Sequence, residues 1–251
     1  MFVNNLDQAP LKHFETLDST MSKAAELASQ QRDEGLAILA THQSAGRGRR
    51  GREWLSGPNA GLWATLVLRP QRTPNDWPSL GIVFAVSLAQ SLEALTKQNL
   101  HIKWPNDIWF NDSKLAGILL EQVDDGEALA IGFGINYVAP QVTDSTQLRH
   151  PAIGLEAVLP ELPTPEDLLR KIRRDFSAPY NGWSLGNWET IRSQFSARNI
   201  LRGSRVSWEH EGSSLIGTAG DIDERGHLVV TLEDGTQTSL LAAEVERITL
   251  G

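Results

Sequence analysis

Residues 101–136 indicate the fold class most directly, and they read HIKWPNDIWFNDSKLAGILLEQVDDGEALAIGFGIN. Two clusters of turn-forming residues, Asn111-Asp112-Ser113 and Asp124-Asp125-Gly126, divide apolar runs of strand-like length. We therefore predict strands over 101–104, 108–110, 114–122 and 128–136. Neighbouring strands joined by short turns run antiparallel, so this stretch is typical of a β-meander.

Helical and strand patterns also lie outside the meander. A core helix is predicted over 80–95, because apolar residues recur there at helical spacing: Leu80, Val83, Phe84, Leu88, Leu92 and Leu95. Asp18-Ser19-Thr20 supplies a cap for a helix over 21–30, and Thr164-Pro165-Glu166-Asp167 opens another helix. Further strands are predicted over 36–41 and 62–68. These elements predict an α+β fold, in which a mixed sheet packs against helices.

The pattern changes after about residue 198. Four short strands are predicted over 205–210, 214–220, 227–232 and 236–241, and glycine-containing turns separate them. We therefore predict two domains: a larger one over residues 1–198 and a small, barrel-like β domain over residues 199–251.

The composition excludes several kinds of protein. A net charge of −8 disfavours broad contact with nucleic acid, because phosphate binding requires a positive face. The chain has no cysteine, which excludes disulfides, thiolate metal sites and thiol nucleophiles. The first residues do not form a signal peptide, and the longest apolar run, Leu80 to Ala89, is far too short to span a membrane. We expect a cytoplasmic protein that contacts neither DNA nor membrane.

Residues 46–61 read GRGRRGREWLSGPNAG and show no periodicity, so they predict a long loop. Its arginines and glycines are suited to binding an anion, through guanidinium groups and backbone amides. The glycines also have the spacing of dinucleotide and P-loop motifs. Both motifs must open a helix, however, and the P-loop needs Lys then Ser or Thr where this chain has Arg52 and Glu53. The loop alone leaves open a small-anion clamp, a solvated basic loop and an RNA-binding patch.

Three further motifs place polar residues in or beside apolar strands: KWPND at 103–107, KLAGIL at 114–119 and GFGIN at 132–136. Each has an ordinary structural explanation. Asn and Asp in a turn commonly cap backbone groups, and a lysine that enters an apolar strand is commonly a solvated strand end. Gly117 is less ordinary, because a glycine inside a strand indicates that a ligand approaches the backbone closely.

Taken together and in this order, these motifs resemble the catalytic domain of the biotin protein ligases. The series is DST at 18–20, Gln43 with GRGRRGREW, KWPND, KLAGIL and GFGIN, and the resemblance covers about residues 10–200. It implies the class II synthetase-like biotin/lipoate ligase fold with a small SH3-like C-terminal domain. One departure is Met21, where the family usually has Asn. Only about ten residues precede the motifs, so the chain resembles the monofunctional class without an N-terminal DNA-binding domain.

The resemblance implies roles for individual residues. The residues that match the catalytic positions are Lys114, Arg49 and Asp107, where Asp107 orients Lys114 or assists metal binding. Those at the biotin positions are Ser19, Thr20, Met21, Gln43, Arg47, Gly48, Arg49, Lys114 and Gly117. Those at the nucleotide positions are Arg49, Arg52, Trp54, Asn106 and Asn136. It does not identify the metal ligands.

The implied reaction consumes ATP and biotin as substrates and uses Mg²⁺. Biotin is activated to biotinyl-5′-AMP with release of pyrophosphate, and is then transferred to a lysine of a biotin carboxyl carrier protein. The expected partner is therefore such a carrier, in acetyl-CoA carboxylase or a similar carboxylase, and a homodimer is possible.

Three rival functions are weighed against this one. A lipoate ligase has a related fold, whereas an octanoyltransferase needs the cysteine that this chain lacks. An RNA- or nucleotide-binding module would use the basic loop, but the rest of the chain is acidic. A degenerate ligase is disfavoured because Lys114 and all four loop arginines are present.

Overall fold

The computed structural model describes residues 5–55, 57–140, 150–210, 213–242 and 247–250. A seven-stranded sheet forms its centre, with strand order β1-β2-β3-β7-β6-β5-β4. The strands are β1 Leu11–Leu17, β2 Leu36–Gln43, β3 Gly61–Leu68, β4 His101–Lys103, β5 Asp107–Phe110, β6 Ser113–Val123 and β7 Ala128–Asn136. The four strands predicted in the meander are therefore confirmed, and they form consecutive antiparallel neighbours in the order β7-β6-β5-β4.

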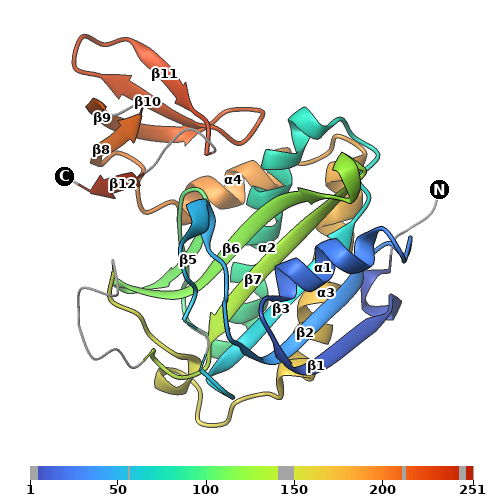
Figure 1. Cartoon of the computed structure of the whole chain (residues 1–251). Helices are drawn as coiled ribbons and strands as arrows, with labels where there is room; N and C mark the ends of the chain where they lie inside the picture. The colour runs from blue at the N-terminus through green and yellow to red at the C-terminus, as the bar shows by residue number, and fades with distance from the viewer. Residues whose placement is uncertain (1–4, 56, 141–149, 211–212, 243–246, 251) are drawn as a thin grey trace.

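Helices cover both faces of this sheet. They are α1 Thr20–Ala28, α2 Trp77–Thr96, α3 Pro165–Ser184 and α4 Glu189–Arg198. Figure 1 shows α1 in front of the sheet and α2 and α3 behind it. The alternation of strand side chains explains the two layers. In β2, Leu36 and Ile38 pack in the cluster under α1, whereas Ala37 and Leu39 pack in the larger cluster on the opposite face.

The predicted cap of α1 is confirmed. The Ser19 hydroxyl accepts a hydrogen bond from the Met21 backbone N–H at 3.2 Å. This bond satisfies one of the first-turn N–H groups that have no partner within the helix. The helix therefore begins at Thr20, beside the end of β2. β1 was not predicted, because LKHFETL alternates irregularly and forms an exposed edge of the sheet. It pairs parallel with β2, and this pair makes the sheet mixed.

Helix α2 is the central helix of the larger hydrophobic core. The helical segment Pro74–Thr96 is long and apolar enough to cross a membrane by length and composition, but 78% of its most apolar window is buried inside the protein. It packs between the sheet and α3. Its apolar character is therefore explained by burial.

The C-terminal part forms a second sheet of five strands, with order β11-β10-β9-β8-β12. Its strands are β8 Arg205–His210, β9 Ser213–Ile222, β10 Leu228–Leu232, β11 Gln237–Leu240 and β12 Arg247–Leu250. Four were predicted, whereas β12 and helix α4 were not. Val206 and Trp208 are buried in the same cluster as α2, so the small sheet packs on the larger unit. The domain boundary at residues 198 and 199 stays a prediction.

Candidate functional site

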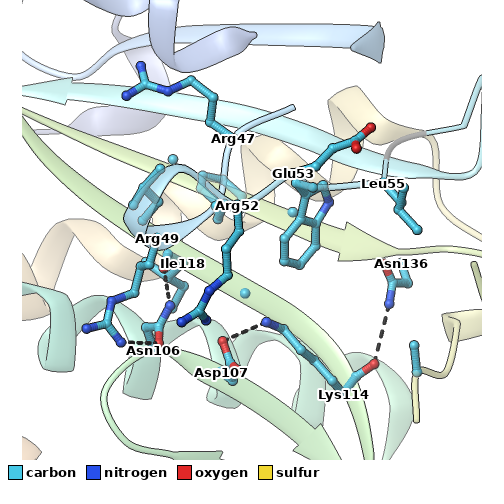
Figure 2. A pocket seen from close by; sticks show the side chains of 18 of the residues that line it. Arg47, Arg49, Arg52, Glu53, Leu55, Asn106, Asp107, Lys114, Ile118 and Asn136 are labelled. Atoms are coloured by element: carbon cyan, nitrogen blue, oxygen red, sulfur yellow. Dashed lines mark hydrogen bonds and ion pairs between the residues drawn. The ribbon is translucent and has the colours of Figure 1, made fainter. Parts of the chain in front are cut away.

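A cavity of about 990 Å³ opens over the sheet strands β2, β7, β6, β5 and β4. It brings together every site residue that the sequence suggested. The fourteen are Ser19, Thr20, Met21, Gln43, Arg47, Gly48, Arg49, Arg52, Trp54, Asn106, Asp107, Lys114, Gly117 and Asn136. Figure 2 shows part of this lining. The loop that carries Arg47, Arg49 and Arg52, here called the arginine loop, lies above the two strands that carry Asp107 and Lys114.

One end of the cavity is lined by a buried polar network. Gln43 Oε1 accepts hydrogen bonds from the backbone N–H of Thr20 at 2.8 Å and from its hydroxyl at 3.1 Å. The Thr65 hydroxyl donates to Thr20 Oγ1 at 2.9 Å. Because these bonds fix the side chains under apolar walls, the end is built to bind a small polar group with matched donors and acceptors. Thr65 was not predicted, although it is the only polar side chain within the apolar strand β3.

Met21 closes this end from the helix side. Its side chain is 3% exposed and packs with the apolar residues between α1 and the sheet. A Cβ atom added to Gly132 would lie 2.5 Å from its sulfur, so Met21 rests directly on the backbone of β7. The residue that departs from the usual family pattern therefore contributes an apolar wall to the cavity.

Two glycines, Gly117 and Gly134, are paired across β6 and β7, and the indole of Trp54 packs directly on both. A Cβ atom at either position would lie 2.6 Å from an atom of that ring. The sequence predicted that a ligand approaches the backbone at Gly117, but in this structure the Trp54 ring occupies that space. The ring also meets Trp63 edge-on, with centroids 6.3 Å apart.

The arginine loop folds back on itself. Gly48 N–H donates to Arg52 O at 2.7 Å, and Trp54 N–H donates to Gly46 O at 2.8 Å. Among its described residues the loop contains the 3₁₀ turn Arg49–Gly51, and it leads into strand β3, not into a helix. The rejection of the dinucleotide and P-loop motifs is therefore confirmed.

The loop arginines point in different directions. Arg47 pairs with Glu121 through Nη2 and Oε1 at 2.7 Å, and Figure 2 shows its side chain directed away from Lys114. Arg49 and Arg52 extend down toward Asn106 and Asp107. Because Arg49 and Arg52 are directed into the cavity and Arg47 is paired with Glu121, this arrangement disfavours the RNA-binding interpretation of the loop.

The centre of the cavity holds a cluster of charges. Lys114 Nζ lies 2.8 Å from Asp107 Oδ1 and 4.9 Å from the centre of the Trp54 ring. Arg49 Nη1 lies 3.5 Å from Asn106 Oδ1. Burial lowers the pKa of the Arg49 guanidinium, and the Asp107 carboxylate partly opposes this effect. A partly desolvated cationic cluster of this kind gains stability when an anion enters.

The backbone around Lys114 is held by Asn136. The Asn136 amide donates to Lys114 O at 3.4 Å and to Ile153 O at 3.2 Å. Asn106 has a similar role on the other side, because its amide donates to Ile118 O at 2.5 Å. Both asparagines thus fix the backbone of the strand that carries Lys114.

Comparison with known proteins identifies the family. Residues 13–136 match the Biotin/lipoate A/B protein ligase family. The biotin–[acetyl-CoA-carboxylase] ligase of Paracoccus denitrificans is 33% identical over 238 residues, which cover 91% of this chain and 96% of that protein. The chain belongs to the biotin protein ligases.

Solved structures agree with this assignment. The ligase shares its fold with the biotin protein ligase from Aquifex aeolicus in complex with biotin and ATP, with a TM-score of 0.83, 24% identity, and coverage of 96% of this chain and 99% of that chain. A biotin protein ligase from Leishmania major in complex with biotinyl-5-AMP is 28% identical, with a TM-score of 0.64 and coverage of 93% and 99%.

Several residues that line the cavity of the ligase were not predicted. Lys103 was quoted in the KWPND motif but given no role, and His150 and Ala152 lie in the segment after β7. Ile248 comes from β12 in the C-terminal sheet. Their positions depend on how distant segments pack, which the local sequence pattern does not encode.

Two connections between strands of the C-terminal sheet also contact site motifs of the ligase, through the backbone carbonyls of Gly226 and Ala242. The Arg49 guanidinium donates to Ala242 O. Trp104, in the KWPND turn, donates from Nε1 to Gly226 O at 3.1 Å and is 1% exposed. The small sheet therefore holds both the loop and the turn that face the cavity.

Replacement of Trp104 by phenylalanine tests this contact. It removes the buried donor and leaves Gly226 O unsatisfied, so we expect a loss of about 2–3 kcal/mol in the free energy of unfolding, measured by urea denaturation. Trp63→Phe is the matched control, because the buried Trp63 Nε1 has no hydrogen-bond partner among the described residues. Equal losses in the two variants would show that the contact contributes nothing beyond packing.

Proposed function

We propose that the cavity is where the ligase carries out both steps of its reaction. It activates biotin with ATP to give biotinyl-5′-AMP and pyrophosphate, and it transfers biotin to a lysine of a biotin carboxyl carrier protein. The observation that carries this proposal is one continuous cavity that connects the polar network at Thr20 and Gln43 with the cationic cluster at Lys114 and Arg49. The first end suits a ureido ring and the second suits phosphates.

The biotin end is assigned on chemistry. A ureido ring has one carbonyl acceptor and two N–H donors, and its fused sulfur ring is apolar. Ser19, Thr20 and Gln43 supply polar partners, while Met21 supplies an apolar wall. The valeryl chain then leads across β7 toward Lys114, and this direction brings the biotin carboxylate to the cationic cluster.

The activation step joins two anions. A carboxylate oxygen of biotin attacks the α-phosphorus of ATP, and the bond from that phosphorus to the bridging oxygen of the β-phosphate breaks. The electron pair of that bond leaves with pyrophosphate. Lys114, Arg49 and Arg52 offset the repulsion between the reactants and the charge on the transferring group. Asp107 holds the Lys114 ammonium in place.

The transfer step uses the mixed anhydride formed in the first step. A neutral amine of the carrier lysine attacks the biotinyl carbonyl carbon, an amide bond forms, and AMP leaves with the bonding electron pair. The lysine nitrogen loses one proton to solvent in this step. Trp54 and Asn136 stand at the positions that the resemblance places near the adenine. Positioning of the two reactants supplies much of the rate.

The lining also fits Mg²⁺ bound together with ATP. Magnesium is commonly held by one or two carboxylates plus substrate phosphates. Asp107 provides one carboxylate in the cavity, and the described residues contain no group of three or more His, Asp and Glu that could hold an ion without a substrate. When bound, Mg²⁺ would supply further charge compensation on the phosphates.

The remaining expectations stay predictions. The absence of DNA and membrane contact and a cytoplasmic location are proposed on the grounds given by the sequence. The sequence gives no grounds for an oligomeric state, so the homodimer is an open alternative to a monomer. The partner class is the carrier domain of a carboxylase, in keeping with the relative named as acting on acetyl-CoA carboxylase.

The proposed function is tested by biotin-dependent release of pyrophosphate from ATP, with lipoate as the parallel substrate. We expect release with biotin and none with lipoate, followed by labelling of a purified biotin carboxyl carrier domain. Release with lipoate alone would instead assign a lipoate ligase. No release with either acid would remove the ligase function, and binding of RNA would be measured next.

A further inference from the structure

A second lysine, Lys103, lies in the cavity at the edge of the sheet. It ends β4 and is 6% exposed. Its Nζ lies 3.3 Å from Nε2 of His150 and 5.2 Å from the centre of the Trp109 ring. Lysine can only donate a hydrogen bond, so His150 Nε2 accepts it. His150 also packs edge-on against Trp109, with ring centroids 5.1 Å apart.

The segment that carries His150 is fixed against the reacting centre. Lys114 N–H donates to Pro151 O at 2.8 Å, and Ile153 N–H donates to Lys114 O at 3.0 Å. These bonds form a parallel bridge between Lys114 and Ala152. The segment 150–153 therefore fixes the backbone position of Lys114 and also places the His150 ring nitrogen where it accepts a hydrogen bond from Lys103.

The order of the strands gives a direction to the cavity. Thr65 lies on β3, Lys114 on β6 and Lys103 on β4, and the strands between them follow the order β3-β7-β6-β5-β4. Neighbouring strands are about 4.8 Å apart, so Lys103 lies about two strand spacings beyond Lys114, on the side away from the biotin end.

The direction matters because phosphoryl transfer proceeds in line. The attacking oxygen and the leaving oxygen lie on opposite sides of the phosphorus. If the biotin carboxylate reaches Lys114 from the side of β7, the leaving group extends toward β5 and β4. There the lining offers Lys103 and His150.

We propose that His150 is a positioning residue for Lys103, and that the ammonium it holds binds the two phosphates of ATP that leave as pyrophosphate. His150 transfers no proton in this step. Its role is to keep the buried Lys103 side chain extended into the cavity, where the positive charge offsets the charge that builds up on the leaving group. The placement of ATP rests on the proposed function.

Three substitutions at His150 separate positioning from packing. Phenylalanine keeps a ring against Trp109 but removes the acceptor. Glutamine places an amide oxygen near the position of Nε2, whereas asparagine is too short to reach Lys103. We expect the Kd for inorganic pyrophosphate, measured by calorimetry, to rise about tenfold in His150→Phe and His150→Asn and to stay near the wild-type value in His150→Gln.

The same variants are compared in steady-state kinetics. We expect the KM for ATP to rise about tenfold in His150→Phe while the KM for biotin stays within twofold. In a Lys103→Met background, His150→Phe should cause no further loss, because the group that it positions is absent. A wild-type Kd for pyrophosphate in His150→Phe, or losses that add fully in the double variant, would overturn the proposal.

Failure of this proposal is distinct from failure of the ligase function. Pyrophosphate binding is measured without biotin and without turnover. If the wild-type protein binds pyrophosphate through Lys103 and His150 but releases none with biotin, the pyrophosphate site is confirmed and the ligase function is excluded. If pyrophosphate is released with biotin and the His150 variants bind pyrophosphate normally, the ligase function is confirmed and the role of His150 is excluded.

Discussion

Replacement of Lys114 by methionine should lower kcat/KM for biotin-dependent pyrophosphate release by about 10³-fold. Its ammonium forms an ion pair with a carboxylate of the cavity, 2.8 Å from Asp107 Oδ1, and it lies over the Trp54 ring. Methionine keeps the length and the apolar stem of the side chain but removes the charge. A single group that stabilises charge in a transition state commonly contributes a factor of this size.

Two companion variants make this test specific. Lys114→Arg keeps the charge but changes its shape, and we expect little rescue, because the larger fork does not fit between Asp107 and Trp54. Lys171→Met removes a lysine that pairs with Asp175 on α3, outside the cavity, and should leave the rate unchanged. Pyrophosphate release is followed by a coupled assay at saturating ATP. Retention of more than a tenth of the wild-type rate in Lys114→Met would exclude a central role for this lysine.

The sequence predicted the elements that are locally specified. The meander, the cap at Ser19 and helix α2 all follow from turn residues and periodicity, and the structure confirms them. Strand β1 was missed because its apolar residues, Leu11, Phe14 and Leu17, recur at every third position and do not alternate. No residue of β1 is fully buried at this edge of the sheet, so fewer of its residues need to be apolar.

The site was predictable where it is made of contiguous motifs, and only there. The loop and KWPND each have an ordinary structural explanation, and they were assigned to the site because the whole ordered series of motifs resembles the biotin protein ligases. His150 has no such signal, because its position depends on the backbone bridge between the segment at 151–153 and Lys114. Gly117 shows a different limit: the pattern correctly indicated close approach to the backbone, but the group that approaches is the indole of Trp54.

Replacement of Gly134 by alanine is the second change with a large expected effect. The added methyl carbon would lie 2.6–2.7 Å from three atoms of the Trp54 indole, so the ring must leave its place on the sheet. The ring also shields Lys114 and meets Trp63 edge-on. Because Trp54 stands at a position that the resemblance places near the adenine, we expect the KM for ATP to rise about 30–100-fold, while the KM for biotin changes by less than threefold.

A control separates this clash from the general cost of adding a methyl group. Gly57→Ala adds the same group where the nearest neighbour, Ala60 Cβ, lies at 3.4 Å, an ordinary contact distance. It should leave both KM values unchanged. Urea denaturation of Gly134→Ala would show whether the fold persists, with an expected loss of about 1–3 kcal/mol in the free energy of unfolding.

A double variant then decides whether the effect passes through Trp54. In a Trp54→Ala background the space over Gly117 and Gly134 is empty, so the methyl group at residue 134 has nothing to displace. We expect Gly134→Ala/Trp54→Ala to match Trp54→Ala alone in its KM for ATP, although the single changes are each large. Full additivity would instead place the effect in the β7 backbone. In that case Gly117 and Gly134 are required for the packing of the sheet, and the contact of the Trp54 indole with them does not contribute to ATP binding.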